Sequence, residues 1–288
     1  MEQRTIGGRS VSALGYGAMY LSIRGRPAEE QGLVALQVAL DGGVTLIDTA
    51  DSYCLNDQDK GHNERLIAKA LLQAGASADT ILVATKGGHT RPNGNWDVDG
   101  RPSYLRQACE ASLIALGVDI IDLYQFHRPD PKVPFEESVG AMADLQREGK
   151  VRMVGLSNVS VAQIDAAQRL VKIVSVQNEF NPWQRRDEAN GVLAACAERG
   201  IAYLPYSPFG GSGRAQGLGD LGPVGAVARA RGATPYQVIL AWLLAKSPVI
   251  IPIPCSTRVA GVRDNLGAAT LTLTPEEIDA LEAMRPTT

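Results

Sequence analysis

The feature that most constrains the fold is a repeated alternation of short apolar segments, rich in β-branched residues, with longer segments of helical spacing. The predicted strands cover residues 13–17, 44–48, 81–86, 122–127, 153–157, 173–177, 201–206 and 249–254. Such alternation is typical of βαβ units, in which a helix returns the chain so that successive strands run parallel. Eight units in succession favour a closed barrel over an open sheet. The sequence therefore predicts an α/β protein with a (β/α)8 TIM-barrel fold.

Signals at the ends of the predicted elements agree with this fold. Three segments after strands read as capping boxes, in which a hydroxyl residue and a Gln or Glu three positions later close the start of a helix. These pairs are Ser160 with Gln163, Thr234 with Gln237, and Thr274 with Glu277. Ahead of the first strand, residues 4–11 turn at Gly7 and Gly8, which predicts a β-hairpin plugging the bottom of the barrel. Because no linker interrupts the pattern, we predict a single domain over residues 1–288.

Composition narrows the class of protein. The formal net charge is -3 and no run of basic residues occurs, so the sequence does not predict a nucleic-acid partner. Apolar runs such as VIIPIP stop short of the ~18 residues that a membrane helix needs. The four cysteines show no CxxC spacing and the N-terminus has no apolar signal core, so we predict a cytoplasmic protein with reduced thiols. The three histidines and the cysteines lack ligand spacing, so no metal is expected.

Four residues at the ends of predicted strands could carry chemistry. Asp48 ends the second strand, Tyr53 follows five residues later, Lys86 ends the third strand and His127 ends the fourth. Each residue alone has a common structural explanation, such as a helix cap, a solvated strand end or a packed imidazole. In a barrel, however, the carboxyl ends of neighbouring strands meet at the catalytic face. An acid, a phenol, an amine and an imidazole placed there together predict one catalytic site.

At this point the sequence resembles the aldo-keto reductase family. The matching phrases are IDTADSY, VATKGG, DLYQFHRPD, VGLSNVS, VQNEFN, LPYSPFGG and IPIPCSTRVAGVRDN, in the family's order and over nearly the whole chain. The resemblance implies a catalytic tetrad of Asp48, Tyr53, Lys86 and His127, and a nicotinamide cofactor bound without a Rossmann motif. A small carbonyl compound would then be the substrate and a secondary alcohol or primary alcohol the product.

The chemistry expected of the tetrad is proton donation. A free tyrosine has a pKa of ~10, and an adjacent ammonium would lower it. We therefore expect Lys86 to acidify Tyr53 and Asp48 to hold Lys86 charged and oriented. A neutral His127 would donate a hydrogen bond to the substrate carbonyl.

The resemblance also implies a set of cofactor contacts. The nicotinamide carboxamide would bind Ser157, Asn158 and Gln177, the ring would stack on Tyr206, and the loop that begins at Ser207 would cradle the pyrophosphate. Arg258 would bind the 2'-phosphate of NADP(H), because a guanidinium matches phosphate geometry. The complete implied set is Gly17, Ala18, Met19, Asp48, Ser157, Asn158, Gln177, Tyr206, Ser207, Phe209, Gly210, Gly211, Ser256, Thr257, Arg258, Asp264 and Asn265. Cys255 and Gly261 depart from residues that many relatives have at these positions.

A second glycine pattern belongs to the same long loop, residues 207–222. Residues 217–222 fit GxGxxG, but the pattern follows the nearest predicted strand by about ten residues, so it lacks the context of a dinucleotide fingerprint. We interpret it as coincidental.

Two other functions fit parts of the pattern. A Schiff-base barrel would use Lys86 as the nucleophile, which requires a desolvated lysine of lowered pKa. A cofactor-binding regulatory subunit could keep the same four residues. The loop of residues 88–102, with His89, Arg91, Trp96 and Asp97, would border the substrate pocket. The chain ends at residue 288 soon after the last predicted helix, so we expect an open site for small aldehydes, sugars or pyridoxal-like substrates; the oligomeric state is not predicted.

Overall fold

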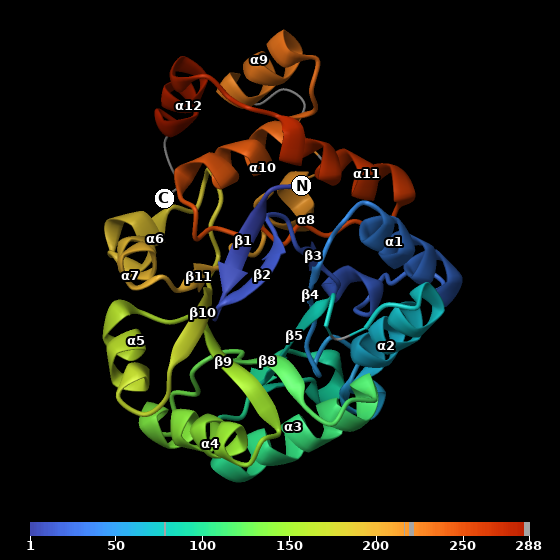
Figure 1. Cartoon of the computed structure of the whole chain (residues 1–288), viewed down its shortest axis with the longest axis vertical. Coiled ribbons are helices and arrows are strands. Elements are labelled where there is room, and N and C mark those ends of the chain that lie inside the picture. The colour runs from blue at the N-terminus through green and yellow to red at the C-terminus, as the bar shows by residue number, and fades with distance from the viewer. Residues whose placement is uncertain (78, 216, 219–221, 285–288) are drawn as a thin grey trace.

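The computed structural model describes residues 1–288 except 78, 216, 219–221 and 285–288. Its centre is a curved sheet of seven parallel strands in the order β11-β10-β9-β8-β5-β4-β3. Their bounds are β3 (Tyr16–Gly17), β4 (Leu46–Asp48), β5 (Leu82–Gly87), β8 (Ile121–Phe126), β9 (Val151–Ser157), β10 (Ile173–Gln177) and β11 (Ala202–Tyr203). Helices surround this sheet in a ring (Figure 1). The predicted (β/α)8 barrel is confirmed.

The predicted eighth strand, residues 249–254, closes the barrel without forming a complete ladder. On one side Ile251 donates its backbone N–H to Tyr203, and Tyr203 donates to Val249. On the other side Gly15 and Gly17 donate to the carbonyls of Pro252 and Pro254, at 2.9 and 3.0 Å. Proline has no N–H to return a bond, so only half of a normal ladder forms beside β3. The segment therefore completes the ring but is not a regular strand, which corrects the sequence prediction.

The predicted N-terminal hairpin is present. β1 (Gln3–Ile6) and β2 (Arg9–Ser12) pair antiparallel around Gly7 and Gly8, whose φ angles of 59° and 94° are the left-handed values that a tight two-residue turn needs. The side chains of Ile6 and Val11 are fully buried among inward-facing strand residues such as Leu46 and Leu123. In Figure 1 the hairpin lies across the end of the barrel nearest the viewer. It plugs the bottom of the barrel, as predicted.

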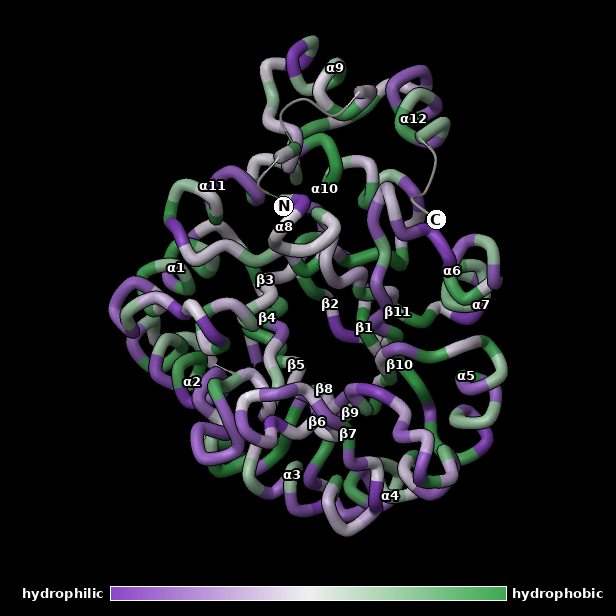
Figure 2. Tube along the Cα trace, turned by 180° about the vertical axis from the view of Figure 1, so that it is seen from behind, coloured by the Kyte–Doolittle hydropathy of each residue, from purple (hydrophilic) through white to green (hydrophobic). Residues whose placement is uncertain are grey.

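Twelve helices are described around the sheet. Their bounds are α1 (Glu29–Asp41), α2 (His62–Ala74), α3 (Pro102–Leu116), α4 (Phe135–Arg147), α5 (Val161–Gln168), α6 (Arg186–Ala189), α7 (Val192–Arg199), α8 (Gly211–Ala215), α9 (Gly222–Arg231), α10 (Pro235–Lys246), α11 (Val259–Gly267) and α12 (Pro275–Glu282). All three predicted capping boxes form, at the starts of α5, α10 and α12. Hydrophilic segments gather on the outer helices and loops, and apolar strands lie inside the ring (Figure 2).

Two loops at the carboxyl end of the strands have structure of their own. The loop after β5 contains an antiparallel pair, β6 (His89–Thr90) and β7 (Asp97–Val98), with His89 opposite Val98. The loop after β11 contains α8, which the sequence did not predict. Part of the coincidental glycine pattern at 217–222 falls on residues 219–221, which lie outside the described residues.

No helix in the described part of the chain is both long enough and apolar enough to cross a membrane.

Candidate active site

Four predicted catalytic residues meet at the carboxyl end of the strands. Asp48 is the last residue of β4, Lys86 lies near the end of β5, His127 follows β8 and Tyr53 lies in the loop after β4. The Lys86 ammonium donates to Asp48 Oδ2 at 2.7 Å, to the Thr49 carbonyl at 2.7 Å and to the Tyr53 hydroxyl at 3.1 Å. These three bonds use every proton of the ammonium. The Tyr53 and His127 rings lie edge to face, with centroids 5.7 Å apart.

The site is buried, and burial governs its electrostatics. The pKa of Tyr53 lies well above its ordinary value, first because burial disfavours the phenolate and then because the Asp48 carboxylate is close. Burial likewise lowers the pKa of Lys86, and the Asp48 carboxylate opposes that change. The expected lowering of the Tyr53 pKa is therefore not found, because burial raises it, although the Lys86 ammonium 3.1 Å from the hydroxyl is placed to favour the phenolate. Tyr53 keeps its proton at neutral pH.

His127 is neutral. Its pKa is well below the ordinary value because the ring is buried, with His89, Lys86 and Arg128 adding to the effect. Among the described residues, its buried Nδ1 has no hydrogen-bond partner. A proton on Nδ1 would be an unsatisfied buried donor, which proteins avoid more strictly than an unsatisfied acceptor. The tautomer with the proton on Nε2 is therefore favoured, and this nitrogen can donate to a ligand.

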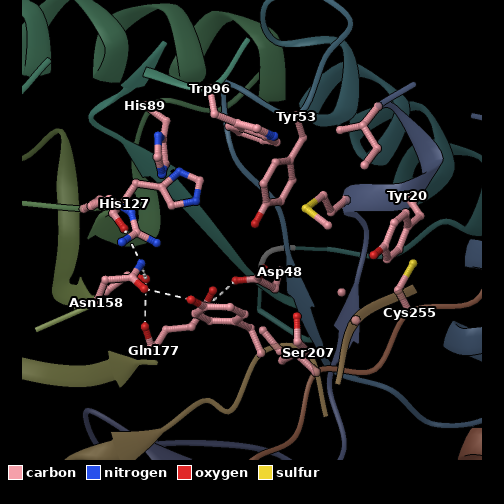
Figure 3. A pocket seen from close by; sticks show the side chains of 18 of the residues that line it. Tyr20, Asp48, Tyr53, His89, Trp96, His127, Asn158, Gln177, Ser207 and Cys255 are labelled. Atoms are coloured by element: carbon pink, nitrogen blue, oxygen red, sulfur yellow. Dashed lines mark hydrogen bonds between the residues drawn. The ribbon is translucent and has the colours of Figure 1, made fainter. Parts of the chain in front are cut away.

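A cavity of about 820 Å³ lies above these residues, with Tyr53, His127, Asn158 and Gln177 among the side chains that line it (Figure 3). Ten of the predicted cofactor residues line it: Gly17, Met19, Asp48, Ser157, Asn158, Gln177, Tyr206, Ser207, Phe209 and Gly211. Lys86 does not line the cavity and lies behind Asp48 and Tyr53.

Hydrogen bonds hold the polar wall of the cavity in place. Gln177 donates to Asp48 Oδ1 at 2.8 Å, and Ser157 donates to the Gln177 carbonyl at 2.7 Å. Asn158, with a left-handed φ of 60°, donates to the His127 carbonyl and accepts a bond from the Tyr206 hydroxyl at 2.8 Å. The dashed lines in Figure 3 include part of this network. The hydrogen bonds link Asp48, His127 and Tyr206 to the three polar residues Ser157, Asn158 and Gln177.

The remaining predicted cofactor residues do not line the cavity. They are Ala18, Gly210, Ser256, Thr257, Arg258, Asp264 and Asn265. Ala18 and Gly210 adjoin lining residues in the chain, and residues 256–258 follow Cys255, which does line the cavity. Asp264 instead accepts hydrogen bonds from the Thr234 hydroxyl, and Asn265 is buried. Arg258 is exposed.

Several lining residues were not predicted as site residues. Tyr20 and Ile23 follow the predicted Met19, Arg128 follows His127, and Cys255 precedes Ser256. The only sequence signal for these residues was their position next to predicted site residues. That position alone does not show which side chains point toward the cavity. Of the residues predicted to border the pocket, His89, Trp96 and Asp97 line it, whereas Arg91 does not and stacks on Trp96, with its guanidinium carbon 3.9 Å from the ring centroid.

Neither metal-binding clusters nor disulfides are found in the described part of the chain. No group of three or more His, Cys, Asp or Glu side chains there could hold a metal ion. All four cysteines are free thiols, as predicted.

Comparison with known proteins identifies the class to which this parallel barrel, with its buried lysine joined to a carboxylate and a phenol, belongs. The Aldo/keto reductase family model matches residues 13–286. A probable aldo-keto reductase of Glycine max is 35% identical, covering 94% of this chain and 84% of the relative. An uncharacterized oxidoreductase of Schizosaccharomyces pombe is 36% identical, covering 96% and 88%. The chain belongs to the aldo/keto reductase family.

Solved structures show the same fold. A thermostable aldo-keto reductase in complex with the inhibitor epalrestat superposes with a TM-score of 0.83 and 31% identity, covering 99% of this chain and 100% of that one. An aldo/keto reductase of Klebsiella pneumoniae in complex with NADP and acetate has a TM-score of 0.83 and 28% identity, covering 99% and 96%. A second structure from Klebsiella pneumoniae, in complex with NADPH, has a TM-score of 0.81 and 27% identity, covering 100% and 97%.

Proposed function

We propose that this protein reduces aldehydes or ketones to alcohols with NADPH, using Tyr53 as the proton donor. One observation carries the proposal: the Lys86 ammonium bonds at once to the Asp48 carboxylate and the Tyr53 hydroxyl beneath a large cavity. The proposal extends to a single domain over residues 1–288 that works in the cytoplasm.

The residues of the cavity suit a nicotinamide cofactor. Ser157, Asn158 and Gln177 offer amide and hydroxyl groups to a carboxamide, and the Tyr206 ring offers a face for stacking. At Gly211 an added Cβ would meet no atom within 4 Å, so the backbone is open there to a bulky phosphate. Relatives crystallised with NADP and NADPH support the identity of the cofactor. The bound cofactor supplies the hydride.

The side chains of this chain would supply position and a proton. The raised pKa of Tyr53, caused mainly by burial, keeps the phenol protonated and ready to donate as negative charge develops on the substrate oxygen. His127, neutral and carrying its proton on Nε2, would donate a hydrogen bond to the same oxygen and orient the carbonyl. Lys86 would stabilise the phenolate left behind, and Asp48 would hold Lys86 in place. Tyr53 is thus protonated at neutral pH, which is the form that carbonyl reduction requires.

The geometry argues against Lys86 as a Schiff-base nucleophile. All three of its protons are committed to Asp48, Thr49 and Tyr53, and its side chain does not reach the cavity surface. A regulatory subunit that binds cofactor without turnover remains the second candidate, because the same cavity would serve it.

The test replaces Tyr53 by Phe, which deletes the hydroxyl and keeps the ring. Reduction of a reactive aldehyde should fall by roughly 10² to 10⁴, the contribution of general acid catalysis, while NADPH binding by fluorescence titration stays intact. Lys86→Met should cause a similar loss, and the double variant should be little worse than either single one, because the residues act as a unit.

The matched control is Tyr203→Phe. It removes a buried hydroxyl that bonds to Asp187 at 2.9 Å, away from the cavity. Thermal melts monitor folding, since Lys86→Met leaves the Asp48 carboxylate buried without its cation. Near-parent turnover in Tyr53→Phe would refute the assignment of the proton donor. NADPH binding with no turnover of any aldehyde by the parent protein would favour the regulatory subunit.

A further inference from the structure

The charged side chains of the cavity are few. Among the described residues that line it, the acids are Asp48 and Asp97 and the only arginine or lysine is Arg128. Asp48 is neutralised by Lys86 at 2.7 Å. Asp97 is exposed, and its carboxylate accepts a bond from the Val98 N–H at 2.9 Å.

The two histidines of the cavity add no charge at neutral pH. His89 Nδ1 lies 2.8 Å from the Asp97 carbonyl oxygen, which can only accept, so Nδ1 carries the proton. Burial lowers the pKa of His89 to about 4 and holds the pKa of His127 well below its usual range, and in both cases the Arg128 charge adds to the effect. The two rings pack edge to face (Figure 3), and their centroids are 4.3 Å apart.

Arg128 is a cation without a carboxylate partner. Its side chain is exposed, and it forms no ion pair with any described residue. It directly follows His127 in the chain and lines the same cavity, where its charge acts on His89 and His127 and its side chain hydrogen-bonds to that of Tyr206. The residues proposed for the pyrophosphate, Ser207 to Gly211, belong to a different loop, the one after β11.

We propose that Arg128 binds an anionic group on the substrate, so that the preferred substrates are carbonyl compounds bearing a carboxylate or a phosphate. This inference rests on the proposed reductase function and adds the substrate class. A guanidinium presents paired N–H donors in a plane, which match two oxygens of either anion. Because Arg128 is exposed and screened by solvent, the expected preference is about tenfold, or ~1.4 kcal/mol.

The experiment compares matched substrates that differ in charge. The kcat/KM values with NADPH are measured for 4-carboxybenzaldehyde against its methyl ester, and for glyceraldehyde 3-phosphate against glyceraldehyde. The parent protein should have a higher kcat/KM for the anionic substrate in at least one pair. The pair in which this preference occurs shows whether the site binds a carboxylate or a phosphate. In Arg128→Gln the preference should disappear, and in the parent it should weaken as salt rises. The quantity compared is the ratio of kcat/KM for the anionic substrate to kcat/KM for its neutral partner. A general loss of activity in a variant lowers both values and leaves this ratio unchanged.

The control is Arg152→Gln. Arg152 is exposed on β9, lies 3.4 Å from Asp122 at the bottom of the barrel, and its replacement changes the net charge by the same amount. It should keep the parent ratio. Equal kcat/KM values within both pairs, or an unchanged preference in Arg128→Gln, would overturn the inference. So would a loss of NADPH affinity in Arg128→Gln as large as the loss for the anion, since Arg128 would then serve the cofactor.

Failure of the proposed function would look different. If no aldehyde were turned over, the reductase proposal would fall, and the anion site would be read from binding alone. Titration of 4-(hydroxymethyl)benzoate and its methyl ester onto the protein with NADPH makes the same comparison without chemistry. Tighter binding of the acid that is lost in Arg128→Gln would support the site, and equal binding would refute it.

Discussion

Asp51 shows how a single buried carboxyl sets a pH dependence. It lies three residues after Asp48, is 3% exposed, and its Oδ1 has no hydrogen-bond partner among the described residues. Burial raises its pKa from 3.8 to about 7, opposed in part by Lys60. Because the folded-state pKa lies above the unfolded value, stability is full below pH 4 and falls as pH rises through about 7.

We therefore predict that Asp51→Asn removes this loss. The variant should gain stability over the parent at pH 8, by up to about 4 kcal/mol, and gain little at pH 4. Urea unfolding at the two pH values measures the difference. Asp79→Asn, a change of the same charge at an exposed position, should leave the parent's pH dependence unaltered. If Asp51→Asn and the parent lose stability in parallel between pH 4 and 8, Asp51 is not the cause.

For the residues of the site, the sequence predicted which side chains lie together but not the directions of their pKa shifts. Strand order alone brought Asp48, Lys86 and His127 to one face, because parallel strands end together. The pKa of Tyr53 moved opposite to expectation, because its direction depends on how deeply the ring is buried, and no local pattern records that. Arg128 was missed for a related reason, since it adjoins the predicted His127 and only the fold shows that both side chains line the cavity.

At the scale of elements, the turn of the N-terminal hairpin predicts how glycine substitutions change the stability of the protein. Gly7 has a φ of 59°, and a Cβ added there would come within 2.5 Å of the Met153 sulfur. Gly7→Ala should destabilise the protein by about 1–2 kcal/mol from the left-handed backbone alone, with the clash adding to it. Gly140→Ala is the matched change, because Gly140 lies inside α4 with no atom within 4 Å of an added Cβ. It should stabilise by about 0.5–1 kcal/mol.

Denaturant midpoints of the two variants measure both effects. A Gly7→Ala variant as stable as the parent would contradict the prediction, because it would mean that the turn accommodates a Cβ despite its positive φ and the nearby Met153 sulfur.

Elements were predicted well where the hydrophobic period was clear and less well where proline intervened. Seven predicted strands were found, although the first and seventh shortened to Tyr16–Gly17 and Ala202–Tyr203. The eighth had the right apolar residues, but Pro252 and Pro254 removed the donors that face β3. The helix α8 was not predicted because its residues, rich in glycine, have weak helix propensity and depend on their surroundings.

For the whole molecule, cofactor binding should appear as thermal stability. A ligand present at a hundred times its Kd adds about 2.7 kcal/mol, which for a chain of this size raises Tm by about 4 °C. We predict that NADPH gives the larger shift and NADH at equal concentration a smaller one, because Arg258 is proposed to bind the 2'-phosphate. Arg258→Ala should reduce the NADPH shift and leave the NADH shift unchanged. Equal shifts from both cofactors in the parent protein would rule out the preference for NADPH.

The backbone hydrogen bonding between β3 and residues 249–254 is incomplete, and this junction borders the cavity. The ring is joined there by two glycine amides that donate to two proline carbonyls and by the Tyr16 hydroxyl, which donates to the Ser256 carbonyl at 2.7 Å. Gly17 and Cys255, one on each side of this join, both line the cavity. A dinucleotide seated between them would contact both sides of this join. Bound cofactor would then add contacts between the first and last units of the barrel, at the place where proline leaves the backbone ladder incomplete.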